Sequence, residues 1–187
     1  MDAKQFLEIL HVAERLKNTI RHCTTSNGRP ESVAEHSWRI SLMALLLRGE
    51  FPEYDIDKVI QMCLIHDLGE CFTGDIPAFN KTDKDREKEE SLLDEWIKSL
   101  PDDVSCHLFE LLKEMNQQKT NEAKLYKALD KLEALIQHNE SPISTWEPQE
   151  YRFQKEYGWQ NVEFSQWLKE LRQQILSDTD EKIARNV

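Results

Sequence analysis

The sequence predicts an all-α protein, a single-domain helical bundle, and three observations favour this class. Apolar residues recur at helical spacing along most of the chain. Only 5 glycines and 6 prolines interrupt that spacing, so long helices can form. No long stretch alternates polar and apolar residues as a strand would. A chain of 187 residues can bury a sizeable core, and we expect residues 1–187 to form one domain.

The first expected helix covers about residues 2–20, where apolar residues from Phe6 to Ile20 keep helical spacing. Residues 21–30 are expected to form a loop, because they contain an Asn-Gly step and end in a proline. This part of the chain therefore predicts one helix and no strand.

Capping residues mark the starts of the next two helices. Ser32 and Glu35 form the Ser-x-x-Glu pattern of a capping box, which places the start of the second helix after Ser32. Asp55 or Asp57 can cap the third helix, which we expect to end near Cys71.

The second half of the chain predicts further helices separated by proline and glycine residues. One of them carries the apolar stripe Leu125, Leu129, Leu132 and Ile136, typical of a buried helix. A polar, frayed tail is expected from Ser177. The expected helices cover about residues 82–100, a segment opened by Pro101, and about residues 121–138, 148–157 and 162–176.

The charge and the cysteines limit the possible partners and location. A net charge of −11 argues against binding a nucleic acid polymer, which needs clustered lysine and arginine residues. It still permits a small phosphorylated ligand, since one metal ion can invert the local field. The 4 cysteines have no Cys-x-x-Cys spacing, and no signal peptide or membrane-spanning stretch is found. We therefore expect a cytoplasmic protein with reduced thiols that does not bind membranes.

Polar residues occur at three places where the pattern predicts buried helix faces. His36 follows the spacing of Ile40 and other apolar residues, and His66-Asp67 interrupts an apolar run. Asp130 lies at the edge of its helix's apolar stripe. Buried charged or titratable groups are costly unless they are paired or bind a metal.

Each of these residues also has an ordinary structural explanation. His36 alone is compatible with a hydrogen-bonded core histidine, and Asp130 with an ion pair to Lys127 or Lys131. Glu35 is assigned to the capping box. The order His, His-Asp, Asp on three different helices favours a shared metal site over these separate roles.

This order resembles the motif of the HD-domain metal-dependent phosphohydrolases, which fold as α-helical bundles. The surrounding sequence looks like the subgroup of bacterial 5′-deoxynucleotidases and their eukaryotic relatives. The resemblance covers about residues 2–140. It depends on four blocks: Glu31 to Ser37, Ile65 to Glu70, Thr73 to Pro77, and Ala128 to Leu132. The aromatic residues Trp146, Tyr157 and Trp159 are expected either to pack the helices in 148–176 on this core or to form a dimer surface, and the tail 177–187 follows.

The resemblance implies that His36, His66, Asp67 and Asp130 are metal ligands. Two neutral imidazoles and two carboxylates suit one divalent cation and leave positions open for phosphate and water. Mn²⁺, Co²⁺ or Mg²⁺ fits six-fold coordination, whereas Zn²⁺ normally takes fewer ligands. A bound cation would polarise the phosphoryl group and activate a water molecule.

Further roles carry over from the resemblance. Glu70, with Asp67, matches the catalytic carboxylates, and Glu70 would orient or deprotonate the attacking water. Arg21 matches the arginine that holds the phosphate, and Asp75 the acid that contacts the sugar hydroxyl. His22 departs from the pattern: a tryptophan that crowds a ribose 2′-hydroxyl occupies this position in the deoxynucleotidases. The choice between deoxyribose and ribose therefore stays open.

These residues predict a divalent-metal-dependent phosphomonoesterase that acts on (deoxy)nucleoside 5′-monophosphates. One alternative is hydrolysis of another phosphorylated small molecule, as by a pyrophosphohydrolase or a phosphodiesterase. Another is a metal- or nucleotide-binding regulatory module without turnover, which an intact set of ligands with Glu70 and Arg21 disfavours. The resemblance also implies a homodimer.

Overall fold

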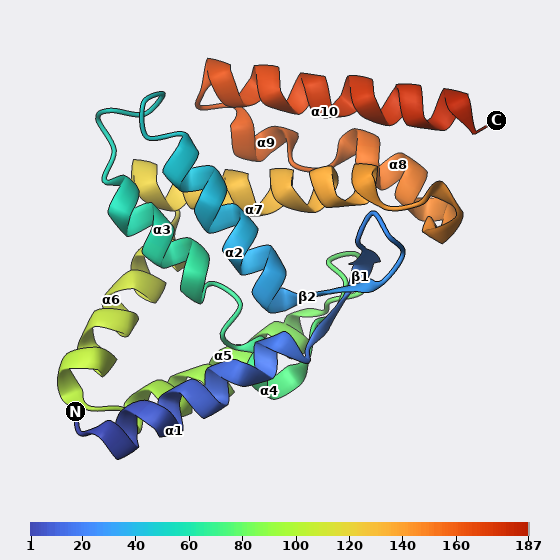
Figure 1. The fold of residues 1–187 in the computed structure, drawn as a ribbon. Helices are drawn as coiled ribbons and strands as arrows, with labels where there is room; N and C mark the ends of the chain where they lie inside the picture. Colours follow the sequence, from blue (N-terminus) through green and yellow to red (C-terminus); the bar gives the residue numbers. More distant parts are fainter. Residues whose placement is uncertain (187) are drawn as a thin grey trace.

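The long helix α7 (Asn121–Glu140) forms the centre of a helical bundle (Figure 1). The computed structural model of the protein describes residues 1–186. The helices α2 (Val33–Leu46), α3 (Ile56–Ile65) and α6 (Asp102–Gln117) contact α7. So do strand β1 (Ile20–Thr24) and the C-terminal helices α9 (Trp159–Val162) and α10 (Gln166–Arg185). Leu125, Leu129 and Leu132 of the predicted stripe are fully buried on α7. The central helix thus joins the N-terminal and C-terminal parts of the chain.

The N-terminal region differs from its prediction. Helix α1 (Ala3–Ala13) and the short 3₁₀ helix η1 (Glu14–Lys17) replace one continuous helix. Strands β1 (Ile20–Thr24) and β2 (Pro30–Ser32) then form an antiparallel hairpin where a loop was expected. The prediction of no strand was wrong, because an Asn-Gly step is also a strong hairpin signal and Gly28 takes a φ of 83° in the turn.

Two predicted caps are confirmed in the next helices. Ser32 and Glu35 form the capping box of α2 (Val33–Leu46), and the Asp55 side chain accepts a hydrogen bond from the backbone of Lys58 at the start of α3 (Ile56–Ile65). The predicted end of the third helix near Cys71 was wrong. The chain leaves α3 after Ile65 in tight turns and enters the short helix α4 (Glu70–Thr73).

The remaining helices follow the predicted order, with two corrections near the C-terminus. The short helix α9 (Trp159–Val162) was not predicted, and the final helix is longer than expected. The final helix does not end near residue 176 but continues to Arg185, because buried Thr179 bonds to Asn139 on α7. Gly158, with a φ of 80°, separates α8 from α9. The helices are α5 (Asp83–Lys98), α6 (Asp102–Gln117), α8 (Pro148–Glu156), α9 (Trp159–Val162) and α10 (Gln166–Arg185), with a 3₁₀ turn η2 (Ile143–Thr145) before α8.

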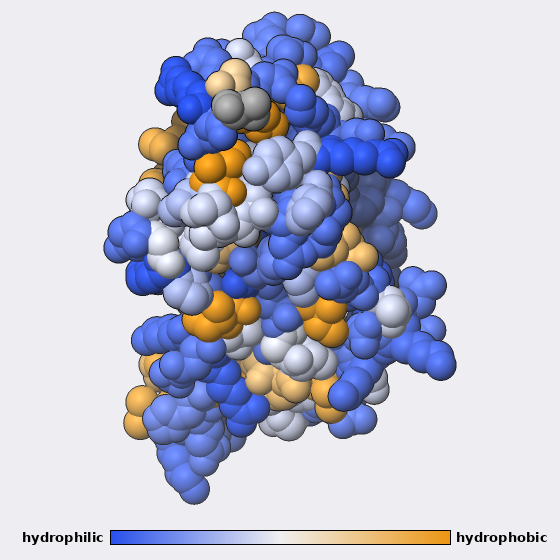
Figure 2. Space-filling model, turned by 90° about the vertical axis from the view of Figure 1, so that its right-hand side faces the viewer, coloured by the Kyte–Doolittle hydropathy of each residue, from blue (hydrophilic) through white to orange (hydrophobic). Residues whose placement is uncertain are grey.

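The all-α class is confirmed, apart from the small hairpin. The face beside the ends of α8 and α10 is largely hydrophilic, with small separate apolar areas (Figure 2). Among residues 1–186, no helix is both long and apolar enough to span a membrane.

Candidate metal centre and its cleft

His66 and Asp67 lie in the tight turns between α3 and α4, not inside a helix as predicted. The backbone bonds of Leu68 and Glu70 reach back only three residues, which tightens the chain here. Gly69 lets α5 come close, since a Cβ there would lie 2.6 Å from Glu89 Cγ. The two side chains are therefore fixed at the end of a helix rather than along its face.

The fold brings the four predicted ligands together from three elements. The donor atoms of His36, His66 and Asp67 lie within 4.8 Å of one another. Asp130 Oδ1 on α7 lies 3.5 Å from His36 Nε2 and 3.9 Å from His66 Nε2. Segments almost a hundred residues apart in the sequence thus meet at one point in the bundle.

Both imidazoles direct Nε2 toward this point. His66 Nδ1 lies 2.9 Å from the carbonyl oxygen of Cys63, which can only accept a hydrogen bond, so Nδ1 carries the proton. His66 Nε2 is then an acceptor, yet it is buried without a hydrogen-bond partner and lies 2.9 Å from Asp67 Oδ2. A cation bound between a neutral imidazole nitrogen and a carboxylate would satisfy both atoms, so this geometry fits a metal ion.

The second imidazole is held in the same way by a carboxylate. His36 Nδ1 contacts Glu133 Oε2 of α7 and leaves Nε2 for the ligand group. Burial favours a neutral His36, but Glu133 and Asp130 raise its pKa to about 9 in the absence of metal. A cation at this point would take the place of that proton.

Asp130 lies at its predicted ligand position and also forms the ion pairs with Lys127 and Lys131 that were expected as the alternative. Its Oδ2 lies 3.0 Å from Lys127 Nζ and 3.1 Å from Lys131 Nζ, while Oδ1 faces the histidines. Burial disfavours the charge, yet Lys131 and Lys127 hold the pKa of Asp130 well below its usual range. The carboxylate is therefore ionised and has one oxygen free to bind a cation.

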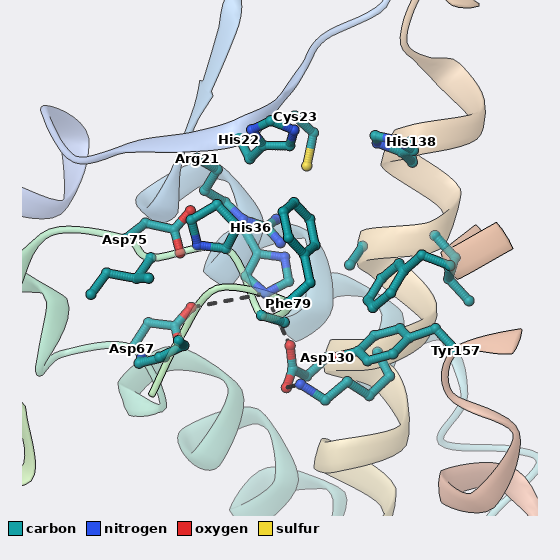
Figure 3. Close-up of a pocket in the computed structure, with 18 of the residues that line it drawn as sticks. Arg21, His22, Cys23, His36, Asp67, Asp75, Phe79, Asp130, His138 and Tyr157 are labelled. Carbon is teal, nitrogen blue, oxygen red and sulfur yellow. Dashed lines mark ion pairs between the residues drawn. The ribbon is translucent and has the colours of Figure 1, made fainter. Parts of the chain in front are cut away.

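A cleft opens beside these residues and encloses about 980 Å³, including its opening to solvent (Figure 3). His66 lies outside its lining. All other predicted site residues line the cleft: Arg21, His22, His36, Asp67, Glu70, Asp75 and Asp130.

Arg21 extends from β1 into the cleft near the ligand group. Its Nη1 donates to Glu31 Oε2 at 2.9 Å and to Glu133 Oε2 at 3.3 Å. Burial opposes its charge, but these carboxylates and the nearby Cys23 keep its pKa above the usual value. Within residues 1–186, Nε and Nη2 of Arg21 make no hydrogen bond, so they are available to an anion.

The remaining predicted residues lie around the same opening. Glu70 starts α4 and is buried, with Lys81 Nζ 3.8 Å away and Oε2 lacking a partner. Burial, followed by Asp67 and Asp75, raises the pKa of Glu70 to about 10. Burial raises the pKa of Asp75, which lines the cleft together with His22.

Comparisons with known proteins agree with this geometry. The family model described as "HD domain" matches residues 13–172, most of the chain. The chain belongs to the HD-domain family. Among its relatives, the Homo sapiens protein named 5′-deoxynucleotidase HDDC2 is 34% identical over 143 residues, covering 74% of this chain and 69% of that protein. The protein of the same name from Dictyostelium discoideum is 33% identical over 142 residues, covering 71% and 75%.

A solved structure extends the likeness to nearly the whole HD-domain chain. A predicted metal-dependent phosphohydrolase from Magnetospirillum magnetotacticum MS-1 superposes with a TM-score of 0.82 at 29% identity. The match covers 98% of this chain and 93% of that one. The protein is therefore an enzyme of the metal-dependent phosphohydrolase class, and it uses a divalent cation.

Sequence reasoning missed Glu133, the residue that connects the parts of this HD-domain site. It is fully buried, and its carboxylate joins the ligand His36 to Arg21. Asp130 lies one turn before it on α7, so a glutamate inside an apolar stripe was the available signal. A buried carboxylate shared by two functional residues fixes the distance between them.

Proposed function

We propose that the protein is a 5′-nucleotidase that removes phosphate from nucleoside 5′-monophosphates, the deoxy forms included. One observation carries the proposal: the convergence of His36 Nε2, His66 Nε2 and the carboxylates of Asp67 and Asp130 beside the free guanidinium edge of Arg21. The name 5′-deoxynucleotidase borne by two relatives that are 33% and 34% identical supports the same substrate class.

In this proposal His36, His66, Asp67 and Asp130 hold one divalent cation. Their mixed nitrogen and oxygen donors, with two carboxylate charges, suit Mn²⁺, Co²⁺ or Mg²⁺ better than Zn²⁺. When bound, the cation supplies Lewis-acid stabilisation of the phosphoryl group and lowers the pKa of a water molecule.

The other cleft residues bind and orient the reactants. Arg21 holds the phosphate through Nε and Nη2, since Glu31 and Glu133 keep its Nη1 in place. Glu70, ionised once a bound cation offsets the charges of Asp67 and Asp75, orients the attacking water and accepts its proton. Asp75 receives the sugar hydroxyl. The water oxygen forms the new bond to phosphorus as the P–O5′ bond breaks. The products are inorganic phosphate and the nucleoside, whose O5′ takes up a proton.

The test is phosphate release from deoxynucleotides, ribonucleotides and p-nitrophenyl phosphate. Each substrate is assayed with Mn²⁺, Co²⁺, Mg²⁺ or Zn²⁺, and again with a chelator. We expect turnover of the nucleoside monophosphates that the chelator abolishes and Mn²⁺, Co²⁺ or Mg²⁺ restores. The absence of release from every substrate with every metal would contradict the proposed function.

We also propose that the enzyme is a homodimer whose interface includes α1. This helix has no buried residue, although Phe6, Leu7 and Leu10 are 48%, 52% and 44% exposed on it. Apolar helix faces of this kind normally pack against a partner. Sedimentation should give a dimer for the wild type and a monomer for Leu7→Glu, and a monomeric wild type at micromolar concentration would exclude this interface.

A cytoplasmic location and a single domain complete the proposal. All four cysteines are free, which suits a reducing compartment, and a net charge of −11 disfavours nucleic acid polymers as partners. The cleft is lined from Arg21 to Tyr157, so the residues after the motif blocks belong to the same folding unit. Cell fractionation and limited proteolysis test these two points.

A further inference from the structure

The cleft has a second region that the proposed chemistry does not use. We call the part of the cleft beside the four ligand residues its inner end, and the part lined by His22, Phe79, Phe153, Tyr157 and His138 its outer end. Phe153 and Tyr157 stack with ring centroids 4.1 Å apart, and Phe79 meets Phe153 edge-on at 5.9 Å. His22 meets Phe79 edge-on at 5.6 Å. Four rings from three parts of the chain thus form one continuous aromatic wall.

A single side chain, that of Lys131, lies between the aromatic wall and the inner end. Lys131 Nζ lies 3.1 Å from Asp130 Oδ2 and 5.4 Å from the centre of the Tyr157 ring. In the close-up, Phe79 and Tyr157 lie across the cleft from Asp67 and Asp75 (Figure 3). A phosphate held at the inner end would therefore place its attached alcohol beside these rings.

A buried carboxylate fixes the far side of the outer end. Glu150 of α8 lies between two imidazoles, with Oε1 3.1 Å from His22 Nε2 and 3.1 Å from His138 Nε2. Its Oε2 accepts a hydrogen bond from the backbone of Glu147, and its side chain is 4% exposed. Glu150 therefore ties β1, α7 and α8 together and holds the His22 ring against the Phe79 ring.

We propose that the outer end binds the nucleobase of the substrate by stacking, with Glu150 as the residue that positions His22. This inference rests on the proposed function, because it assigns the ring of the nucleoside monophosphate to the aromatic wall. Every base has a π-face, so stacking favours nucleotides over aliphatic phosphates without selecting one base. The substrate class is thus nucleoside monophosphates with broad base tolerance, rather than sugar phosphates.

Two equally exposed phenylalanines allow a matched experiment. Phe79 and Phe164 are both 37% exposed, but only Phe79 lines the cleft. The ratio of kcat/KM for 2′-deoxyadenosine 5′-monophosphate to that for 2-deoxyribose 5-phosphate is measured in the wild type, Phe79→Leu and Phe164→Leu. We expect a ratio of about 10 to 100 in the wild type, a drop of about tenfold in Phe79→Leu, and no change in Phe164→Leu.

A wild-type ratio near one, or an equal drop in both variants, would overturn the subsite. A second measurement separates this failure from failure of the proposed function. Calorimetric titration with 2′-deoxyadenosine, which has no phosphate to release, should show binding to the wild type and to Phe164→Leu. Binding at least tenfold weaker in Phe79→Leu supports the subsite even if no phosphate is released. No binding to the wild type, or equal binding to all three, refutes it.

Discussion

The two ends of the cleft are stabilised by different interactions. At the inner end, His66 Nε2 is buried without a hydrogen-bond partner and faces the carboxylates of Asp67 and Asp130, an arrangement that a bound cation would satisfy. At the outer end, the rings of Phe79, Phe153 and Tyr157 pack on each other and need no ligand to be stable. The inner end therefore depends on interactions between charged groups, and the outer end on the burial of aromatic surface.

Because of this difference, substitutions at the two ends should change the rate and the substrate binding by different amounts. Removing a group from the inner end leaves an uncompensated buried charge, and effects of several kcal/mol are normal there. Removing a ring from the outer end loses only about 1–3 kcal/mol of stacking. Large losses of rate should therefore come from the inner end, and modest changes in substrate binding from the outer end.

Asp67→Ala tests the inner end with the largest expected effect. The substitution removes a ligand that lies 2.9 Å from His66 Nε2, so we expect loss of Mn²⁺ binding in calorimetry. Turnover should fall by about 10³-fold or more, because the metal supplies several kcal/mol of transition-state stabilisation. Asp57→Ala, on the exposed surface of α3 beside Arg48, is the control.

The same variant tests whether the two ends are separate. Asp67→Ala should still bind 2′-deoxyadenosine with wild-type affinity, since the stacked rings do not contact Asp67. Loss of nucleoside binding together with metal binding would show that the ends form one cooperative unit.

Glu70→Gln should lower the rate while sparing the metal. Loss of a general base typically costs about 10²- to 10⁴-fold in kcat, whereas Mn²⁺ affinity should stay near that of the wild type. Unchanged turnover would remove the role assigned to this carboxylate. Exposed Glu87 on α5 provides the control variant Glu87→Gln.

The same glutamate predicts a pH dependence of stability in the metal-free protein. Burial, Asp67 and Asp75 raise the pKa of Glu70 to about 10 in the folded state, against about 4.3 in an unfolded chain. Between these values the unfolded chain releases a proton that the folded protein keeps, so rising pH destabilises the fold. Glu70→Gln removes this penalty. Its Tm in the presence of a chelator should exceed that of the wild type by a margin that grows with pH, and parallel profiles would contradict the assignment.

Glu133→Gln should weaken the inner end without removing a ligand. Glutamine cannot supply the charge that holds His36 Nδ1 and Arg21 Nη1, so Mn²⁺ affinity should fall by about 10- to 100-fold. Glu140→Gln is the matched control, because Glu140 is on the same helix and pairs with Arg39 but does not contact His36. Equal affinities of the two variants would exclude Glu133 as the link between metal and phosphate sites.

The contrast between the ends also explains how far the sequence alone could lead. The helical class, the Ser32 capping box and the Asp55 cap depend on local patterns, and the structure confirms them. The four inner-end residues could be selected because polar groups are rare on buried faces, and the structure brings them together. Their roles as ligands stay predictions that the Asp67 and Glu133 variants test.

Other features could not be predicted because they depend on packing between distant segments. Glu133 becomes a buried partner of His36 only when α7 packs on α2, and its place in an apolar stripe does not identify that partner. Phe153 and Tyr157 look like ordinary packing residues until α8 folds beside the hairpin. The hairpin itself was missed, since five residues of β1 are too few to show strand alternation.

Glu150→Gln gives the smallest expected effect and tests the outer end alone. Glutamine keeps the size of Glu150 but loses the charge between His22 and His138, so the His22 ring is less firmly held. We expect KM for a nucleoside monophosphate to rise by about two- to fivefold with kcat unchanged, a loss of under about 1 kcal/mol. Glu147→Gln is the control, because Glu147 lies 3.9 Å from His22 and is largely exposed. A fall in kcat at constant KM would place Glu150 in the chemistry of the inner end, and equal effects in both variants would leave His22 without a positioning residue.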